Sequence, residues 1–221
     1  MSFTNLSPHP RPAKQAARIA SIAIVGISYF LTAVIALHFL RPDYDPVSRF
    51  VSEYAVGQYG FLMTSAFFGL SLGSLALVIG LYQGVSRSAR SWIGLILLGI
   101  WGVAILIAGI FPTALKGAPA TISDNIHALA SLVSFLSLIP ATILLSRRFK
   151  QDKKWRPFHR SALILSLVIL GTFIGFFLTS ETEFAGLNQR IFIATFLIWL
   201  LLAAARLRLI ALAPFSKSQK L

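Results

Sequence analysis

The residues of this 221-residue chain that could do chemistry gather near the ends of its apolar segments. Asp124 and His127 are three residues apart, which places both on one face of a helix. There a carboxylate can orient a histidine base, or the two side chains can bind a metal ion. Arg190 can bind an anionic group. The candidate polar cluster comprises Ser52, Glu53, Asp124, His127, Asn188, Gln189 and Arg190.

Several members of this cluster also have a purely structural interpretation. Ser123 or Asp124 can cap a helix that begins there, because a side-chain oxygen accepts a hydrogen bond from a free backbone N–H group. Arg190 is expected to pair with Asp124 or Glu53. Glu53 has a second predicted partner in Arg49, four residues earlier, in an exposed pair worth about 0.3–0.5 kcal/mol.

No recognised catalytic motif accompanies the cluster. The chain has no cysteine, and it contains no glycine-rich phosphate loop, HExxH zinc motif or GxSxG nucleophile elbow. We therefore assign no catalytic residue, no metal and no cofactor, and whether the protein is an enzyme stays open. For His127 the sequence leaves both a structural and a functional role open.

Six long apolar segments must position these residues. The chain is 56% hydrophobic and 12% charged, with a mean hydropathy of +0.77, whereas a soluble domain has roughly twice that charged fraction. Each segment holds about 20 residues, enough to cross a hydrocarbon core of about 30 Å. Because the connections are short, we predict an all-α bundle of six transmembrane helices. The predicted spans are 19–40, 60–82, 92–111, 125–146, 161–180 and 188–207.

The charges predict the orientation of the bundle, because Lys and Arg are retained on the cytoplasmic side of a membrane. Sixteen of the twenty basic residues fall on one side of the predicted spans, together with both chain ends. Residues 1–18 and 209–221 are therefore predicted to be cytoplasmic tails of a domain, 19–208, in the cell (inner) membrane. The outer side receives six of the seven acidic residues and four basic ones, Arg41, Arg49, Lys116 and Arg190.

The formal net charge of +13 does not indicate nucleic-acid binding, since the basic residues lie in short segments beside apolar ones. The densest basic segment, 150–156, is predicted to face lipid headgroups and allows binding of an anionic lipid. Trp92 and Trp155 flank this side and are expected to anchor in the membrane interface. The lipid bilayer is thus the predicted partner, and the oligomeric state stays open.

The first outer loop is predicted to contain a short amphipathic helix. Asp45 and Pro46 form a favourable helix start. Ser52 and Glu53 lie on the polar face, and we expect the helix to lie on the outer membrane surface or to cap the bundle. Its apolar stripe consists of Val47, Phe50, Val51 and Tyr54.

Small residues predict which helix faces pack closely. The second segment carries Ser65, Gly69 and Gly73, and the fifth carries Gly171 and Gly175. A spacing of four residues places each set on one stripe, where another helix can approach. We expect both stripes to pack within the chain, the alternative being a dimer interface.

Four stretches together resemble domain of unknown function 998, a bacterial and archaeal family of membrane proteins. They are 45–57, which includes Ser52-Glu53-Tyr54-Ala55-Val56-Gly57, then Gly109-Ile110-Phe111-Pro112-Thr113, the helix start from Asp124 to His127, and Gly186-Leu187-Asn188-Gln189-Arg190. The resemblance implies a compact six-helix membrane protein and no particular reaction. An acidic residue usually follows the Phe-Pro-Thr step in the family pattern, whereas this chain has Ala114, which argues against a metal or hydrolase site. His127 and Arg190 fall on positions that the family pattern marks.

These observations predict an integral membrane protein with an outward-facing polar pocket for a lipid or small ligand. One alternative is a lipid-modifying enzyme at the outer leaflet, with His127 as general base and Arg190 holding an anionic headgroup. Another is a small transporter, although the central thirds of the spans lack the ionisable groups that such carriers use. A scaffold for another membrane protein is the third.

Overall fold

The computed structural model describes residues 11–115 and 117–213, and every regular element in these ranges is helical. Six of the helices described are long and apolar enough to cross a membrane, which confirms the predicted fold class. His9, Lys116, Lys217, Lys220 and the outer parts of both predicted tails lie outside the described residues. The elements are α1 (Arg11–Leu40), η1 (Val51–Ala55), α2 (Gly60–Gly84), η2 (Arg87–Ala89), α3 (Trp92–Ile110), α4 (Ile122–Phe149), α5 (Arg156–Leu178) and α6 (Ala185–Leu212), where η denotes a 3-10 helix.

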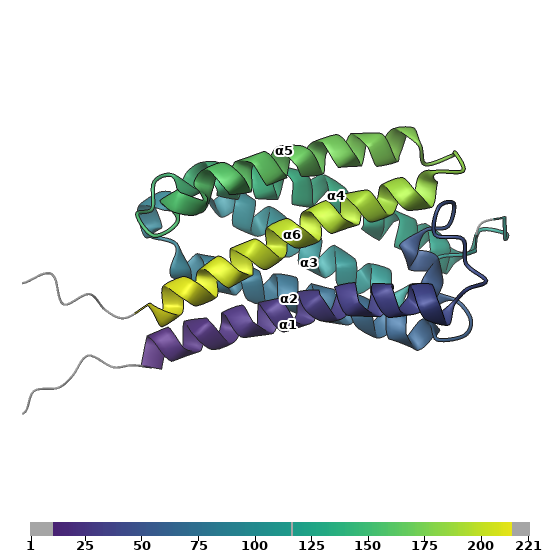
Figure 1. Ribbon diagram of the computed structural model, residues 1–221, viewed down its shortest axis with the longest axis horizontal. Coiled ribbons are helices and arrows are strands. Elements are labelled where there is room, and N and C mark those ends of the chain that lie inside the picture. The colour runs from purple at the N-terminus through teal and green to yellow at the C-terminus, as the bar shows by residue number, and fades with distance from the viewer. Residues whose placement is uncertain (1–10, 116, 214–221) are drawn as a thin grey trace, which may run out of the picture.

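The six helices run side by side as antiparallel neighbours (Figure 1). Each helix packs against the next one in the chain, and α6 returns to pack against both α1 and α2. The described chain begins and ends at the same end of the bundle, which we call the terminal end, together with loops 85–91 and 150–155. The opposite end, here the distal end, carries loops 41–59, 111–121 and 179–184.

Most helices extend beyond the spans predicted from hydropathy. The first helix begins at Arg11 rather than Ile19, and the last ends at Leu212 rather than Leu207. Ala, Lys, Gln and Arg favour helix, so a helix continues past the end of its apolar run. Residues 11–18 and 209–212, which the sequence assigned to tails, are therefore helical.

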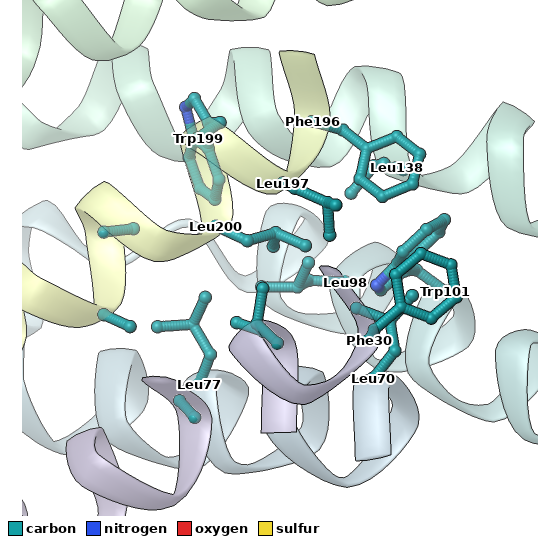
Figure 2. Packing of buried hydrophobic residues seen from close by; sticks show 14 of the residues in the cluster. Phe30, Leu70, Leu77, Leu98, Trp101, Leu138, Phe196, Leu197, Trp199 and Leu200 are labelled. Carbon is teal, nitrogen blue, oxygen red and sulfur yellow. The ribbon is translucent and has the colours of Figure 1, made fainter. Parts of the chain in front are cut away.

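Large apolar side chains fill the centre of the bundle (Figure 2). Trp101 of α3 and Trp199 of α6 are both 0% exposed. The indole Nε1 of Trp101 donates to Ser74 Oγ at 2.9 Å, and that of Trp199 donates to Ser146 Oγ at 3.1 Å. Buried indole donors need such partners where water is absent. The middle of the bundle is therefore a packed core with satisfied polar groups.

Glycine allows α1 and α2 to approach most closely. A Cβ atom on Gly26 would lie 2.3 Å from the carbonyl oxygen of Gly69 and 3.0 Å from the Cα atom of Gly73. Because no side chain separates the two backbones, they gain dispersion contacts that hold helices together in lipid. The predicted intrachain packing of this stripe on α2 is confirmed.

The corresponding prediction for α5 was wrong. Apart from the adjoining residues and backbone of α5 itself, no heavy atom of the described residues lies within 4 Å of a Cβ atom placed on Gly171 or Gly175. This helix buries Ala162, Ser166 and Ile169 instead. Gly171 follows Ile169 by two residues, about 200° around the helix, so the small-residue stripe faces away from the bundle.

At the terminal end, loop 150–155 is fastened to the loop between α2 and α3. Asp152 is buried, and its carboxylate accepts hydrogen bonds from the backbone N–H groups of Ser86 and Lys154, both at 2.8 Å. Burial raises the pKa of Asp152, but the hydrogen bonds outweigh burial and the net pKa is lowered. The ionised carboxylate thus stabilises the contact between the two loops.

The two tryptophans predicted as interfacial anchors differ in the structure. Trp92 is 59% exposed, as expected. Trp155 is fully buried, because its ring stacks on Phe149 with centroids 4.5 Å apart and its Nε1 donates to the carbonyl oxygen of Gly84 at 3.1 Å. The predicted anchoring of Trp155 at the interface was wrong.

The glycine contact predicts the effect of adding one methyl group. Gly26→Ala places a Cβ against the Gly69 carbonyl and should lower the free energy of unfolding by about 1–3 kcal/mol. Gly171→Ala adds the same group in open space and is the matched control. Chemical unfolding of both variants in detergent measures the difference. Equal stability of the two variants would contradict the close approach of α1 and α2.

Asp152 predicts a pH dependence of stability. Its lowered folded-state pKa gives a contribution that is fully present above the unfolded value of about 3.9 and is lost as the pH falls through the folded value. Asp152→Asn replaces one acceptor oxygen with a donor and should cost about 1–3 kcal/mol at neutral pH. The difference in Tm between wild type and variant should stay constant from about pH 6 to 8 and shrink below about pH 4. A difference that grows on acidification would refute this role.

Candidate functional site

The segment 45–55, here called the cap, closes the distal end by lying on the first turns of α6. The carbonyl oxygen of Val47 accepts from the backbone N–H of Leu187 at 2.8 Å, and the N–H of Val51 donates to Gln189 Oε1 at 2.7 Å. Gly186 permits this approach, since a Cβ atom there would lie 2.3 Å from the Arg49 carbonyl oxygen. The loop backbone therefore contacts the helix backbone directly.

The cap is not the single helix that the sequence predicted. Asp45 Oδ1 accepts from Val47 N at 3.0 Å and Oδ2 from Ser48 Oγ at 2.6 Å, so this residue stabilises a turn. Phe50 is then extended, with φ −71° and ψ 148°, before the short helix η1 (Val51–Ala55) begins. The break lies at the contact with α6, where Val51 donates to Gln189. Of the two predicted placements, capping of the bundle is the one observed, with Val51, Glu53 and Tyr54 buried.

Arg41 joins the two chain segments that flank the cap. Arg41 is buried, and its Nη1 donates to the carbonyl oxygens of Val56 and Gln58, both at 3.0 Å. Its Nη2 contacts Asp43 Oδ2 at 2.8 Å. The hydrogen bond from Arg41 lowers the pKa of the Asp43 carboxyl, so the pair stays ionised at neutral pH.

Glu53 lies inside the cap rather than on an exposed polar face. Its Oε2 accepts from Arg49 Nη1 at 2.8 Å, and its Oε1 accepts from the backbone N–H of Phe50 at 2.9 Å. The predicted pairing with Arg49 is present. The Glu53 side chain is only 2% exposed, however, so this is not the exposed pair that the spacing predicted. Glu53 stabilises the turn that leads into η1.

Arg190 joins the cap to α1 and α6. Its Nε donates to His38 Nε2 at 2.9 Å. Its Nη1 donates to the carbonyl oxygens of Arg49 at 2.6 Å and Gly186 at 3.0 Å, and its Nη2 lies 3.4 Å from the Tyr54 hydroxyl. The guanidinium fork thus connects three elements by hydrogen bonds to neutral groups.

The contacts of His38 show that it is neutral. Its Nδ1 lies 2.6 Å from the carbonyl oxygen of Val34, which can only accept, so Nδ1 carries the proton. Nε2 is then the acceptor for Arg190. Of the two acidic partners predicted for Arg190, Asp124 is engaged elsewhere, because it binds the loop after α3.

Asp124 fastens the start of α4 to that loop. Its Oδ1 accepts from Thr113 Oγ1 and from the backbone N–H of Ala114, both at 2.9 Å. The helix cap is Thr121, whose hydroxyl accepts from the backbone N–H of Asp124. The predicted cap at Ser123 or Asp124 was therefore wrong. Helix α4 begins at Ile122, about one turn before the predicted span 125–146.

His127 is buried one turn further along α4. Its Nδ1 donates to the carbonyl oxygens of Ala108 at 2.8 Å and Phe111 at 2.9 Å. These oxygens only accept, so Nδ1 carries a proton, and in the neutral imidazole Nε2 is the acceptor. The hydrogen bonds of His127 and Asp124 go to different groups. The predicted pair of base and orienting carboxylate is thus not formed.

A cavity of about 40 Å³ lies beneath the cap. A buried water needs about 10–15 Å³ on this measure, so the cavity has room for about three water-sized groups. Aromatic and apolar side chains form most of its wall, with polar side chains from the cap, α4 and α6. The lining residues are Phe30, Val51, Ser52, Phe67, Leu70, Ile105, His127, Ser131, Ser134, Phe135, Gln189, Ile193 and Phe196.

Among the lining side chains, His127 and Gln189 keep unused hydrogen-bonding groups within the described part of the chain. His127 Nε2 makes no hydrogen bond there, and in the neutral ring it is an acceptor. The Oε1 of Gln189 is occupied by Val51 N, which leaves the two N–H donors of its amide. The cavity therefore offers both an acceptor and donors within apolar walls.

The cavity unites three of the seven predicted cluster residues, Ser52, His127 and Gln189. The other four are not part of its lining. Glu53 and Arg190 hold the cap, and Asp124 holds the loop after α3. Asn188 donates from Nδ2 to Thr179 Oγ1 at 3.0 Å, which ties α6 to the preceding loop. Most of the predicted polar cluster thus fastens the distal loops.

Three polar residues near the site were missed from the sequence. Ser131 and Ser134 follow His127 at spacings of four and seven, which places them on the same helix face and was a readable signal. His38 had no such signal, because its partner Arg190 is 152 residues away. Within the described ranges, no three His, Cys, Asp or Glu side chains are grouped so that they could hold a metal ion.

The contacts of Arg190 predict that lysine cannot replace it. A single ammonium group cannot bond to the cap, α6 and His38 at once. Arg190→Lys should therefore lower the free energy of unfolding by about 3 kcal/mol, as two hydrogen bonds of a charged group are lost. Arg87→Lys, at an exposed site of the terminal end, is the control. Both variants are unfolded by heat in detergent. An equal loss of stability in the two would disprove the linking role of Arg190.

Comparison with known proteins gives one match. Residues 24–206 match the family model described as protein of unknown function (DUF998), which includes the six apolar helices, the cap, His127 and Arg190. No curated protein matches the chain, and no solved structure does. The match extends over most of the 221 residues, so this multi-pass membrane protein belongs to the DUF998 family, whose function is unknown.

Proposed function

We propose that the protein binds a small polar ligand, or the polar end of a lipid, in the distal cavity, and that this end faces the cell exterior. The charge distribution supports the orientation. Arg87, Arg90 and the basic segment 147–160 belong to the terminal end, which positive-inside retention places in the cytoplasm together with both chain termini. The membrane is then the cell membrane, and the cap faces outward.

The observation that carries the proposal is the unused Nε2 of His127. Two backbone carbonyl oxygens hold the ring through Nδ1 and fix its tautomer. An acceptor on the wall of a largely apolar cavity is costly to leave without a partner, and a bound donor group would remove that cost. The unpaired amide donors of Gln189, which lines the same cavity, allow a ligand that both donates and accepts.

The same Nε2 supports a second candidate, an enzyme in which His127 acts as general base on a lipid at the outer leaflet. In this candidate Arg190 was the group expected to hold an anionic headgroup. Its Nε and both terminal nitrogens already contact His38, the cap and α6, and it does not line the cavity. Binding of a neutral polar group therefore has the stronger support. The packed centre around Trp101 gives a transport path no support.

Lipid contacts form the other part of the proposal. Lys153, Lys154 and Arg156 are exposed at the terminal end, beside the helices that cross the membrane. Each basic side chain near an anionic membrane surface contributes about 1 kcal/mol to the free energy of binding to that surface. We infer that this segment attracts anionic lipid headgroups in the cytoplasmic leaflet without selecting one lipid.

The cavity proposal is tested by NMR of protein labelled with ¹⁵N-histidine, using acetamide as the probe because it both donates and accepts. Binding should shift the Nε2 resonance of His127 in a saturable way. Gln189→Leu should weaken the response several-fold, because it removes the amide donors that line the cavity with His127. Gln83→Leu, at an exposed site of α2, is the control. A His127 resonance that does not respond, or that responds as the His159 resonance does, would disprove binding in the cavity.

A further inference from the structure

The lipid-facing side of α2 and α3 is hollowed toward the terminal end. A groove of about 360 Å³ runs between the two helices. No heavy atom of the described residues lies within 4 Å of a Cβ atom placed on Gly99, so the floor of the groove is open there. The wall is formed by Val78, Ile79 and Tyr82 of α2 and by Trp92, Ile96 and Gly99 of α3.

Arg90 packs on the ring of Tyr82, one of the residues that line this groove. Its Cζ atom is 4.4 Å from the centroid of the Tyr82 ring, and that ring is 5.6 Å from the ring of Trp92. The Nε of Arg90 donates to the carbonyl oxygen of Val85 at 3.1 Å, which holds the side chain in place. Its two terminal nitrogens have no hydrogen-bond partner within the described part of the chain. A positioned guanidinium with unused donors thus stands beside an apolar groove.

We propose that this groove holds one acyl chain of an anionic phospholipid whose phosphate binds Arg90. Guanidinium and phosphate form paired, charge-assisted hydrogen bonds. Tyr82 and Trp92 beside Arg90 are the residue types that lie at headgroup level. From Trp92 to Gly99 the groove follows α3 for about 10 Å. That length fits within one leaflet of about 15 Å, half of the hydrocarbon core.

The site is separate from the cavity of the proposed function, which lies at the other end of the bundle. It also differs from the general attraction of the basic segment 150–156, because it needs one arginine and one groove. A lipid that merely surrounds the protein would contact the same surface with no headgroup preference. A specific lipid site differs from this general contact because it combines the positive charge of Arg90 with the open space at Gly99.

Fluorescence quenching by brominated lipid tests the proposal on the intact protein in phosphatidylcholine vesicles. Trp92 is 59% exposed, whereas Trp101, Trp155 and Trp199 are 0% exposed, so bromine on acyl chains reports mainly on Trp92. A small mole fraction of brominated phosphatidylglycerol is compared with the same fraction of brominated phosphatidylcholine. We expect apparent binding about fivefold tighter for phosphatidylglycerol, the equivalent of about 1 kcal/mol for one arginine at an anionic headgroup.

Two variants separate the headgroup contact from the groove. Arg90→Gln should abolish the preference for phosphatidylglycerol, and Gly99→Leu should reduce quenching by the bound lipid because it fills the groove. Arg87→Gln removes an exposed charge from the same loop and should leave most of the preference intact. Equal quenching by the two lipids in wild type would overturn the proposal. So would a preference that survives Arg90→Gln, or one that Arg87→Gln lowers equally.

Discussion

Contact between the cap and the start of α6 is the interaction on which the distal half of the molecule depends. Backbone polar groups at the end of a membrane bundle need partners, and here a loop and a helix supply them to each other. Leu187 donates to Val47, and Val51 donates to Gln189. The approach needs a residue without a side chain at Gly186. Arg190 then fastens the same contact from the side.

This contact also creates the cavity. The cap lies over the space between α1, α2, α3, α4 and α6, and it contributes Val51 and Ser52 to the wall. Because Gln189 gives its oxygen to Val51, its amide donors are the part left for a ligand. On the other wall, the carbonyl groups at the end of α3 fix the tautomer of His127. Structural hydrogen bonds thus decide which atoms stay available for binding.

Much of the fold could be predicted because its signals are local. Apolar length identifies a membrane helix, and each of the six predicted spans falls on one of the six helices, although individual helix ends differ by up to eight residues. The candidate site was predicted less well. Ser52, His127 and Gln189 line the cavity, but Arg190, Asp124 and Glu53 turned out to hold loops. A polar residue at a helix end looks the same in sequence whether it binds a ligand or a backbone carbonyl.

The sequence by itself determined the membrane class, the six helices and the grouping of ionisable residues at their ends, because the exclusion of charge from hydrocarbon acts on each residue separately. Only the tertiary structure decided that His38 accepts from Arg190, that Trp155 is buried and that the α5 stripe faces outward. Those outcomes depend on pairs of residues far apart in the chain and on the rotation of each helix about its axis. Neither quantity is encoded in local spacing.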